Sequence, residues 1–180
     1  MEKCSKTKMR RGLYVGRFQP FHKGHLKVVE LLLRKVNELV IVIGSAQYSH
    51  QLDNVFTAGE RITMIKEALD EAKLDSCRCY IVPLIDTMVH SIWVSHVVSY
   101  VPRFDVVFTN ESLTRRLFKE AGFDVKAIPK YERNVYSSTE VRRRLVKAEN
   151  WEELVPKAVA RYIKSIDGVE RLRDLLKSDK

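Results

Sequence analysis

Short apolar segments alternate with amphipathic segments along most of this 180-residue chain. Residues 39–44 (Leu-Val-Ile-Val-Ile-Gly) form an almost continuous run of branched side chains, which is typical of a strand buried on both faces. Residues 25–36 instead place leucine and valine at helical spacing. This alternation predicts an α/β fold, a Rossmann-like, doubly wound parallel sheet of about five strands with helices on both faces.

Local start and stop signals give the expected boundaries of these elements. Strands are predicted at 12–17, 39–44, 79–83, 105–109 and 125–128, and helices at 25–36, 57–72, 91–101 and 112–121. Thr57 and Glu60 have the spacing of a capping box, and Pro102 and Gly122 follow two of the helices. Residues 1–11 are predicted to be a flexible segment, and residues 12–180 a single domain that includes helices at its C-terminal end.

The chain is basic, with 32 lysines and arginines against 23 aspartates and glutamates, a formal net charge of +9. This charge favours polyanionic partners, from small ones such as ATP to nucleic acids, but does not select among them. No apolar run approaches the roughly 20 residues that span a bilayer. The polar N-terminus has no apolar stretch of signal-peptide type behind it. We therefore expect a cytoplasmic protein with no membrane partner.

The three cysteines, Cys4, Cys77 and Cys79, do not have the spacing of a zinc-binding set. Cys77 and Cys79 flank Arg78 in a predicted strand, and we do not expect them to form a disulfide. We interpret all three as structural or incidental thiols. No metal site made of protein side chains is predicted.

The loop after the first predicted strand carries two histidines, His22 and His25, with Gly24 between them. About one helical turn separates the histidines, so both rings can face one ligand, and the glycine allows close approach of the backbone. The following helix offers free N–H groups and the positive end of its dipole to an anion. Together with Arg17, these residues predict a nucleotide triphosphate site at the carboxyl end of the strand. The alternatives are a zinc site, which lacks a third ligand nearby, and two unrelated polar loop residues.

A second motif covers residues 136–144 (Tyr-Ser-Ser-Thr-Glu-Val-Arg-Arg-Arg). Ser137 and Glu140 have capping-box spacing, so a helix is predicted to begin here, with Arg142 in its first turn and able to reach an anion at that end. Taken alone, the motif favours a solvated basic helix face with an ordinary cap. Beside the histidine loop, it makes two phosphate-binding helix N-termini in one α/β domain.

Together the two motifs resemble the nucleotidyltransferase superfamily marked by (His/Thr)-x-Gly-His near the N-terminus and Ser-Ser-Thr-x-x-Arg near the C-terminus. Segments 16–25, 44–50, 56–61 and 136–144 are similar to the archaeal-type nicotinamide-nucleotide adenylyltransferases, in a match that covers residues 12–170. The resemblance implies transfer of the adenylyl group of ATP to nicotinamide mononucleotide, giving NAD and pyrophosphate. It also implies direct in-line attack without a covalent enzyme intermediate, so the protein positions groups and stabilises charge.

The resemblance also implies roles for the residues that match the family's motifs. His22, His25, Arg17 and Arg142 would be catalytic. The residues expected to bind ATP are Gly16, Arg17, Phe18, His22, Gly24, His25, Tyr136, Ser137, Ser138, Thr139 and Arg142. Asp86 and Trp93 would bind the mononucleotide, with Trp93 stacked on the cationic nicotinamide ring or, in the alternative, buried as a core aromatic.

The acceptor side departs from the family pattern at three positions. His90 stands where asparagine is often found, Asp53 where a basic residue can occur, and Asn110 where a glycine-containing turn is expected. A related nucleotidyltransferase that uses flavin mononucleotide or phosphopantetheine therefore stays open as an alternative. A basic nucleic-acid-binding module, motivated by the run of arginines at 142–144, is the second alternative, although no RNA-recognition or helix-turn-helix signature accompanies it.

The resemblance extends to cofactors and partners. It implies Mg²⁺ bound with ATP through phosphate oxygens and water. ATP and nicotinamide mononucleotide would be the substrates and NAD the product, with no nucleic-acid partner. The family forms homo-oligomers, hexamers among them.

Overall fold

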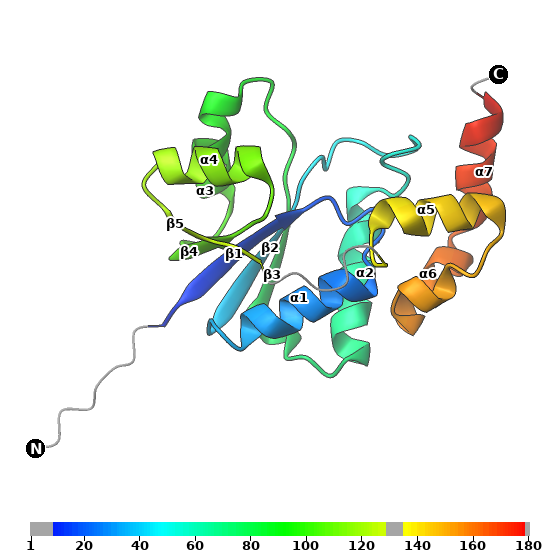
Figure 1. The fold of residues 1–180 in the computed structure, drawn as a ribbon, viewed down its shortest axis with the longest axis horizontal. Helices are drawn as coiled ribbons and strands as arrows, with labels where there is room; N and C mark the ends of the chain where they lie inside the picture. Colours follow the sequence, from blue (N-terminus) through cyan, green and yellow to red (C-terminus); the bar gives the residue numbers. More distant parts are fainter. Residues whose placement is uncertain (1–8, 129–134, 179–180) are drawn as a thin grey trace, which may run out of the picture.

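The fold is a five-stranded parallel sheet covered by helices (Figure 1), and the computed structural model describes residues 9–128 and 135–178. Its strands are β1 (Arg11–Gly16), β2 (Glu38–Ile43), β3 (Cys79–Pro83), β4 (Val106–Phe108) and β5 (Asp124–Lys126). Its helices are α1 (Lys23–Leu33), α2 (Ala58–Glu71), α3 (Trp93–Tyr100), α4 (Ser112–Glu120), α5 (Ser138–Lys147), α6 (Lys157–Ser165) and α7 (Gly168–Ser178). Single 3₁₀ turns are η1 (Ser76–Arg78), η2 (His90–Ile92) and η3 (Glu152–Leu154).

The strand order is β3-β2-β1-β4-β5, and every neighbouring pair is parallel. The chain therefore reverses its direction of travel across the sheet at β1, between β2 and β4. This confirms the predicted doubly wound α/β fold. In such a sheet, ligands bind beyond the carboxyl ends of the strands at the reversal point, which is where the loop after β1 lies.

Alternating side chains of the central strands face two separate cores, as the period of two in a strand requires. Ile41 and Ile43 of β2 join the larger core beneath α1, α2 and the C-terminal helices, whereas Val40 and Val42 join the smaller core beneath α3 and α4. Figure 1 shows α1 and α2 on one side of the sheet and α3 and α4 on the other. Among the described helices, none combines the length and the apolar character needed to cross a membrane.

The predicted element order is confirmed, with differences at the ends. The helix predicted at 91–101 begins as η2 and becomes α-helical only at Trp93. The strand predicted at 125–128 ends at Lys126, because the side-chain amide of Asn110 bonds the N–H and C=O of Ile128 (3.1 and 2.9 Å) where a neighbouring strand would.

The N-terminal segment and the cysteines differ from the prediction in detail. Residues 1–8 of the segment predicted to be flexible lie outside the described residues, and β1 already includes Arg11. The strand expected to contain both Cys77 and Cys79 is wrong for Cys77, because Asp75 caps the 3₁₀ turn η1 there and β3 begins at Cys79. Both thiols are free, and burial raises the pKa of Cys79 to about 11, so that this thiol is unreactive at neutral pH.

Candidate active site

A cavity of about 290 Å³ opens at the carboxyl edge of the sheet, between β1, the start of α1, the loop after β4 and the start of α5. Seven of the predicted ATP-binding residues line it: Gly16, His22, Gly24, His25, Tyr136, Ser137 and Ser138. The two motifs are more than 100 positions apart in the sequence, and the fold brings them together. The remaining wall consists of Tyr14, Val15, Val28, Thr109, Asn110, Glu111 and Ile128.

The two histidines form a reciprocal cap on the N-terminus of α1. Nδ1 of His22 accepts from the backbone N–H of His25, and Nδ1 of His25 accepts from the backbone N–H of His22, both at 3.3 Å. The imidazole rings are stacked with their centroids 3.5 Å apart. Because Nδ1 accepts in both rings, the proton of each neutral imidazole must lie on Nε2. The pair therefore presents Nε2–H groups as donors without carrying a charge.

Burial keeps these imidazoles neutral. It lowers the pKa of His22 to about 3, and it lowers the pKa of His25 well below its ordinary value, with repulsion from His22 acting in the same direction. The rings of Phe18 and Phe21 pack against His25, with centroids 4.9 and 5.5 Å away, and provide much of this apolar surrounding. At neutral pH the pair can donate hydrogen bonds to phosphate oxygens but adds no positive charge.

The N-termini of α1 and α5, which are open toward the cavity, contribute positive potential. Among the described residues, nothing accepts a hydrogen bond from the N–H groups of Lys23 and Gly24 in α1 or of Ser138 and Thr139 in α5. The N-terminus of α4 is different, because the carboxylate of Glu111 already accepts from its first N–H groups. The N-termini of α1 and α5 can therefore bind an external anion, whereas the N-terminus of α4 is already bound by a carboxylate of the chain itself.

Gly24 permits the close approach of these two helix ends. A Cβ atom at this position would lie 2.9 Å from Cβ of Tyr136 and 3.0 Å from the His22 ring, well inside van der Waals contact. Any larger residue would therefore separate α5 from α1 or displace the His22 imidazole. The predicted role of this glycine in close backbone approach agrees with the geometry.

The hydroxyl groups of the second motif are not equivalent. Ser137 is the N-cap of α5, and its Oγ accepts from the N–H of Glu140 (3.1 Å), which leaves its own proton free to be donated. The hydroxyl of Ser138 donates to the carbonyl of Pro20 (3.0 Å) and so joins α5 to the loop after β1. The predicted capping box is only half formed, because the Glu140 carboxylate binds Arg143 and Arg144 instead of the Ser137 backbone.

Arg17 and Arg142 lie beside the 290 Å³ cavity rather than in its wall. Arg17 is exposed and lines a neighbouring hollow of about 500 Å³ together with Asp53. Arg142 is the fifth residue of α5, not in its first turn as predicted, and its buried guanidinium donates to the Gln19 carbonyl (2.8 Å) and to Asp53 (2.9 Å). The pKa of Arg142 is lowered by burial and by repulsion from Arg17, and Asp53 opposes both effects. The Asp53 carboxylate is thus paired with Arg142, and Arg17 lines the same hollow beside it.

Two other residues predicted to bind ATP have their side chains elsewhere. Phe18 is buried beneath the site and packs edge-on against both Tyr14 and His25, so it supports the histidine ring and does not line the cavity. The side chain of Thr139 is exposed outside the cavity wall.

The two residues predicted to bind the mononucleotide lie away from the cavity. Asp86 follows β3 and is exposed, and its carboxylate accepts from the N–H and the hydroxyl of Ser45 (3.0 and 2.7 Å). Trp93 is half-buried at the start of α3, with its ring edge-on to Phe118 at 5.5 Å. Asp86 is at the carboxyl edge of the sheet, but no described contact joins it to Trp93.

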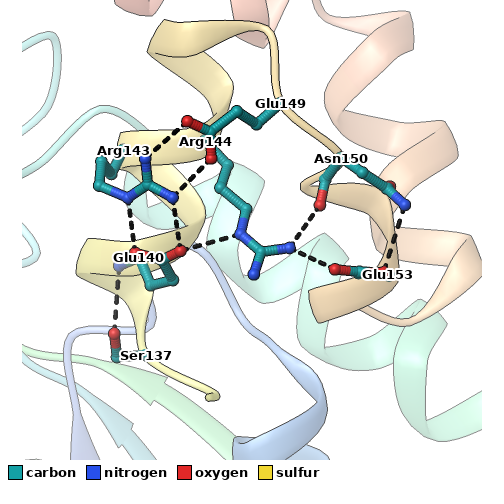
Figure 2. Close-up of polar contacts among 7 residues, drawn as sticks. All are labelled: Ser137, Glu140, Arg143, Arg144, Glu149, Asn150 and Glu153. Atoms are coloured by element: carbon teal, nitrogen blue, oxygen red, sulfur yellow. Dashed lines mark hydrogen bonds and ion pairs between the residues drawn. The ribbon is translucent and has the colours of Figure 1, made fainter. Parts of the chain in front are cut away.

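The other two arginines of the second motif turn away from the cavity. Figure 2 shows Arg143 between Glu140 and Glu149, and Arg144 between Glu140, Glu153 and the carbonyl of Asn150. Each of the three consecutive arginines, Arg142 included, is therefore paired with a carboxylate. The run that motivated the nucleic-acid alternative does not form an exposed basic surface.

Sequence reasoning missed Arg61, whose side chain is completely buried behind the site. Its guanidinium donates to the carbonyls of Arg17, Gly44 and Ser45, at the ends of β1 and β2. A signal was present in the sequence, because Arg61 occupies the apolar stripe of α2 that continues with Met64 and Ile65. A charged residue in a buried stripe indicates a specific polar partner.

A family model described as cytidylyltransferase-like matches residues 13–144. The nicotinamide-nucleotide adenylyltransferase of Archaeoglobus fulgidus is 55% identical over 168 residues, which are 92% of this chain and 97% of that protein. The protein of the same name from Saccharolobus solfataricus is 48% identical over 172 residues, which are 96% of this chain and 100% of that protein.

A solved structure of a bifunctional NMN adenylyltransferase/ADP ribose pyrophosphatase from Francisella tularensis, complexed with AMP and a Mn ion, has a similar fold. The TM-score is 0.76 at 24% identity, over 95% of this chain and 53% of that one, so this chain spans about half its length. The fold agrees with that neighbour, and the identity to the archaeal relatives extends over nearly their whole length. The chain therefore belongs to the nicotinamide-nucleotide adenylyltransferase family.

Proposed function

We propose that this protein transfers the adenylyl group of ATP to nicotinamide mononucleotide, and that the cavity between α1 and α5 is where the ATP phosphates bind. The observation that carries the proposal is the pair of open helix N-termini, α1 and α5, which line one cavity together with two neutral imidazole donors. The N-terminus of α4, by contrast, is occupied by the carboxylate of Glu111. A polyphosphate meets the most complementary surface here.

In the proposed reaction, an oxygen of the mononucleotide's 5′-phosphate attacks the α-phosphorus of ATP. The new P–O bond forms as the bond between the α-phosphorus and the bridging oxygen breaks, and pyrophosphate leaves with the electron pair. The Nε2–H groups of His22 and His25 donate to the phosphoryl oxygens as negative charge develops there. The protein acts by positioning and by charge stabilisation, and it forms no covalent bond to the substrate.

The leaving pyrophosphate is assigned to the α5 side of the site. The free proton of the Ser137 hydroxyl and the N–H groups of Ser138 and Thr139 would donate to the β- and γ-phosphates. Arg17 and Arg142 would supply the positive charge, and the phosphates would take the place that Asp53 holds beside Arg142.

We propose that Mg²⁺ enters with ATP and is held by phosphate oxygens and water. The described residues contain no cluster of three or more potential metal ligands, and the Nδ1 atoms of the two histidines are already engaged as acceptors. This donor set fits an ion that arrives on the nucleotide rather than one resident in the protein. When bound, the ion would supply further neutralisation of the phosphate charge.

The mononucleotide is assigned to the region of Asp86 and Trp93. Asp86 offers a carboxylate oriented by Ser45, and the half-buried Trp93 offers part of an indole face to the cationic nicotinamide ring.

We also propose that the protein assembles as a homo-oligomer, hexamers included. The segment between β3 and α3 carries exposed apolar side chains, among them Met88, which is 98% exposed, and such side chains are typical of an interface. Light scattering measures the assembly directly, and a monomer at working concentration would contradict it.

The test of the proposed function is an acceptor screen with ATP and Mg²⁺ that measures pyrophosphate release and identifies the product. Nicotinamide mononucleotide should support release and yield NAD, whereas flavin mononucleotide and phosphopantetheine should not. Release with flavin mononucleotide only would overturn the nicotinamide assignment. The variant His25→Ala should lose turnover by orders of magnitude while remaining folded, and near wild-type turnover would contradict the assigned role of the pair.

A further inference from the structure

The most unusual buried group outside the cavity is the guanidinium of Arg61. Its side chain is 0% exposed, and among the described residues it forms no ion pair with a carboxylate. It bonds four backbone carbonyls instead: Nη1 donates to Arg17 and Gly44 (2.9 Å each), Nη2 to Ser45 (3.1 Å) and Nε to Thr57 (3.2 Å). Burial, with repulsion from Arg17, lowers its pKa to about 10, so that it stays charged at neutral pH.

A buried cation without a direct anionic partner is a costly way to fill a core position. The other residues of the same helix stripe, Met64, Ile65, Ala68 and Leu69, show that an apolar side chain suits this interface. The charge of Arg61 therefore points to a role beyond packing. The nearby carboxylates that attract it are those of Asp86 and Glu60, which lie beyond hydrogen-bond distance.

Ser45 connects Arg61 to Asp86. The carbonyl of Ser45 accepts from Arg61, while its N–H and its hydroxyl both donate to the Asp86 carboxylate. Ser45 has a φ of 51°, in the left-handed region that residues other than glycine rarely adopt, and such a conformation persists only where its surroundings hold it. Arg61 holds it from one side and Asp86 from the other.

We propose that Arg61 is a positioning residue for the acceptor side of the site, which acts through Ser45 to orient the Asp86 carboxylate toward the mononucleotide. Its bond to the Arg17 carbonyl ties this arrangement to the loop after β1, which carries the histidine pair. The inference rests on the proposed function, since the assignment of Asp86 to the mononucleotide belongs to that proposal. It explains how buried Arg61 sets the position of the exposed Asp86 carboxylate.

The test uses Arg61→Lys, which keeps the charge but cannot span several carbonyls, because an ammonium lacks the planar fork of a guanidinium. We expect the KM for nicotinamide mononucleotide to rise about tenfold, as for one weakened hydrogen bond to a charged group, and the KM for ATP to rise less. Arg78→Lys is the matched control, because Arg78 also donates to three backbone carbonyls, those of Leu33, Val36 and Asn37, far from the site. The control should lose stability and leave the KM for the mononucleotide unchanged.

A double-substitution cycle shows whether Arg61 acts through Asp86. If it does, Arg61→Lys should add less than about twofold to the KM of Asp86→Asn, because the group it orients is already lost. The proposal would be overturned if the double variant raised the KM for the mononucleotide by the product of the two single effects. It would also be overturned if this KM changed no more in Arg61→Lys than in Arg78→Lys. An inactive wild-type protein in the acceptor screen would instead count against the proposed function.

Ser45→Ala keeps the proposal testable if Arg61→Lys does not fold. This variant removes only the hydroxyl bond to Asp86 and leaves the backbone N–H bond and the Arg61 contacts in place. The KM for the mononucleotide should rise about threefold, in line with the loss of one of two hydrogen bonds. An unchanged KM in this folded variant would also overturn the inference.

Discussion

The neutral state of the stacked histidines should make the protein lose stability in mild acid. His22 has a pKa of about 3 in the folded protein and an ordinary value of 6.5, which we take for the unfolded chain. Between these values the unfolded chain binds one more proton than the folded protein, so stability is complete above 6.5 and falls as the pH drops. Each pH unit in this window costs about 1.4 kcal/mol per proton, so His22 alone costs about 2 kcal/mol between pH 7 and pH 5.

His25 adds to this loss, because its pKa is lowered as well. The described carboxylates whose pKa is lowered, such as Glu60 and Glu140, contribute mainly below their ordinary value of 4.5, so the interval from pH 7 to pH 5 isolates the histidines. The measurement is urea unfolding at several pH values in this interval, with the free energy of unfolding extrapolated to water.

The informative variant is His22→Asn, since asparagine is a good N-cap residue and can still accept from the N–H of His25. This variant should lose about 2 kcal/mol less than the wild type between pH 7 and pH 5. His90→Asn, which replaces an exposed histidine, is the control and should follow the wild type. Parallel curves for His22→Asn and the wild type would refute the argument that burial holds the His22 imidazole neutral.

Three further changes test other parts of the site. Trp93→Ala should raise the KM for the mononucleotide more than that for ATP, and equal changes would show that Trp93 acts only as a core aromatic. Asp53→Asn should tighten ATP binding about threefold in calorimetry at low salt, because the carboxylate that competes for Arg142 is lost, and the gain should shrink in high salt; weaker binding would mean that Asp53 positions Arg142. Gln19→Leu should cost about 2–4 kcal/mol of unfolding free energy, because the Gln19 amide satisfies the buried N–H and C=O of Phe56; a loss below about 1 kcal/mol in urea unfolding would contradict this.

The sheet could be predicted because it depends on a hydropathy pattern repeated along the chain, whereas the meeting of the two distant motifs was expected from the family resemblance. Strand order was not needed to place the histidine loop at a carboxyl end, since the loop directly follows β1. The start of α2 was also predictable, because Thr57 and Glu60 form a complete capping box. Local chemistry alone specifies such features.

The contacts that join distant segments could not be predicted. The Ser137–Glu140 spacing is that of a capping box, but the Glu140 carboxylate goes to Arg143 and Arg144, because a charge-assisted pair competes with the backbone N–H. Similarly, nothing local indicates that Arg142 meets Asp53 from a loop 89 positions away. Asp53 departs from the family pattern, and the structure shows that its carboxylate contacts one of the arginines expected to bind phosphate.

The ion pairs of Figure 2 have a consequence for anyone who shortens or redesigns the C-terminal region. Glu140, one turn from Ser137, is linked through Arg144 to Glu153 in η3, and Trp151 and Leu154 on either side of Glu153 belong to the larger core. The segment after α5 lines no part of the 290 Å³ cavity, yet it holds the helix whose first residues do. Deletions beyond residue 150 should therefore disturb the phosphate site, because α5 would lose the contacts that hold it in place.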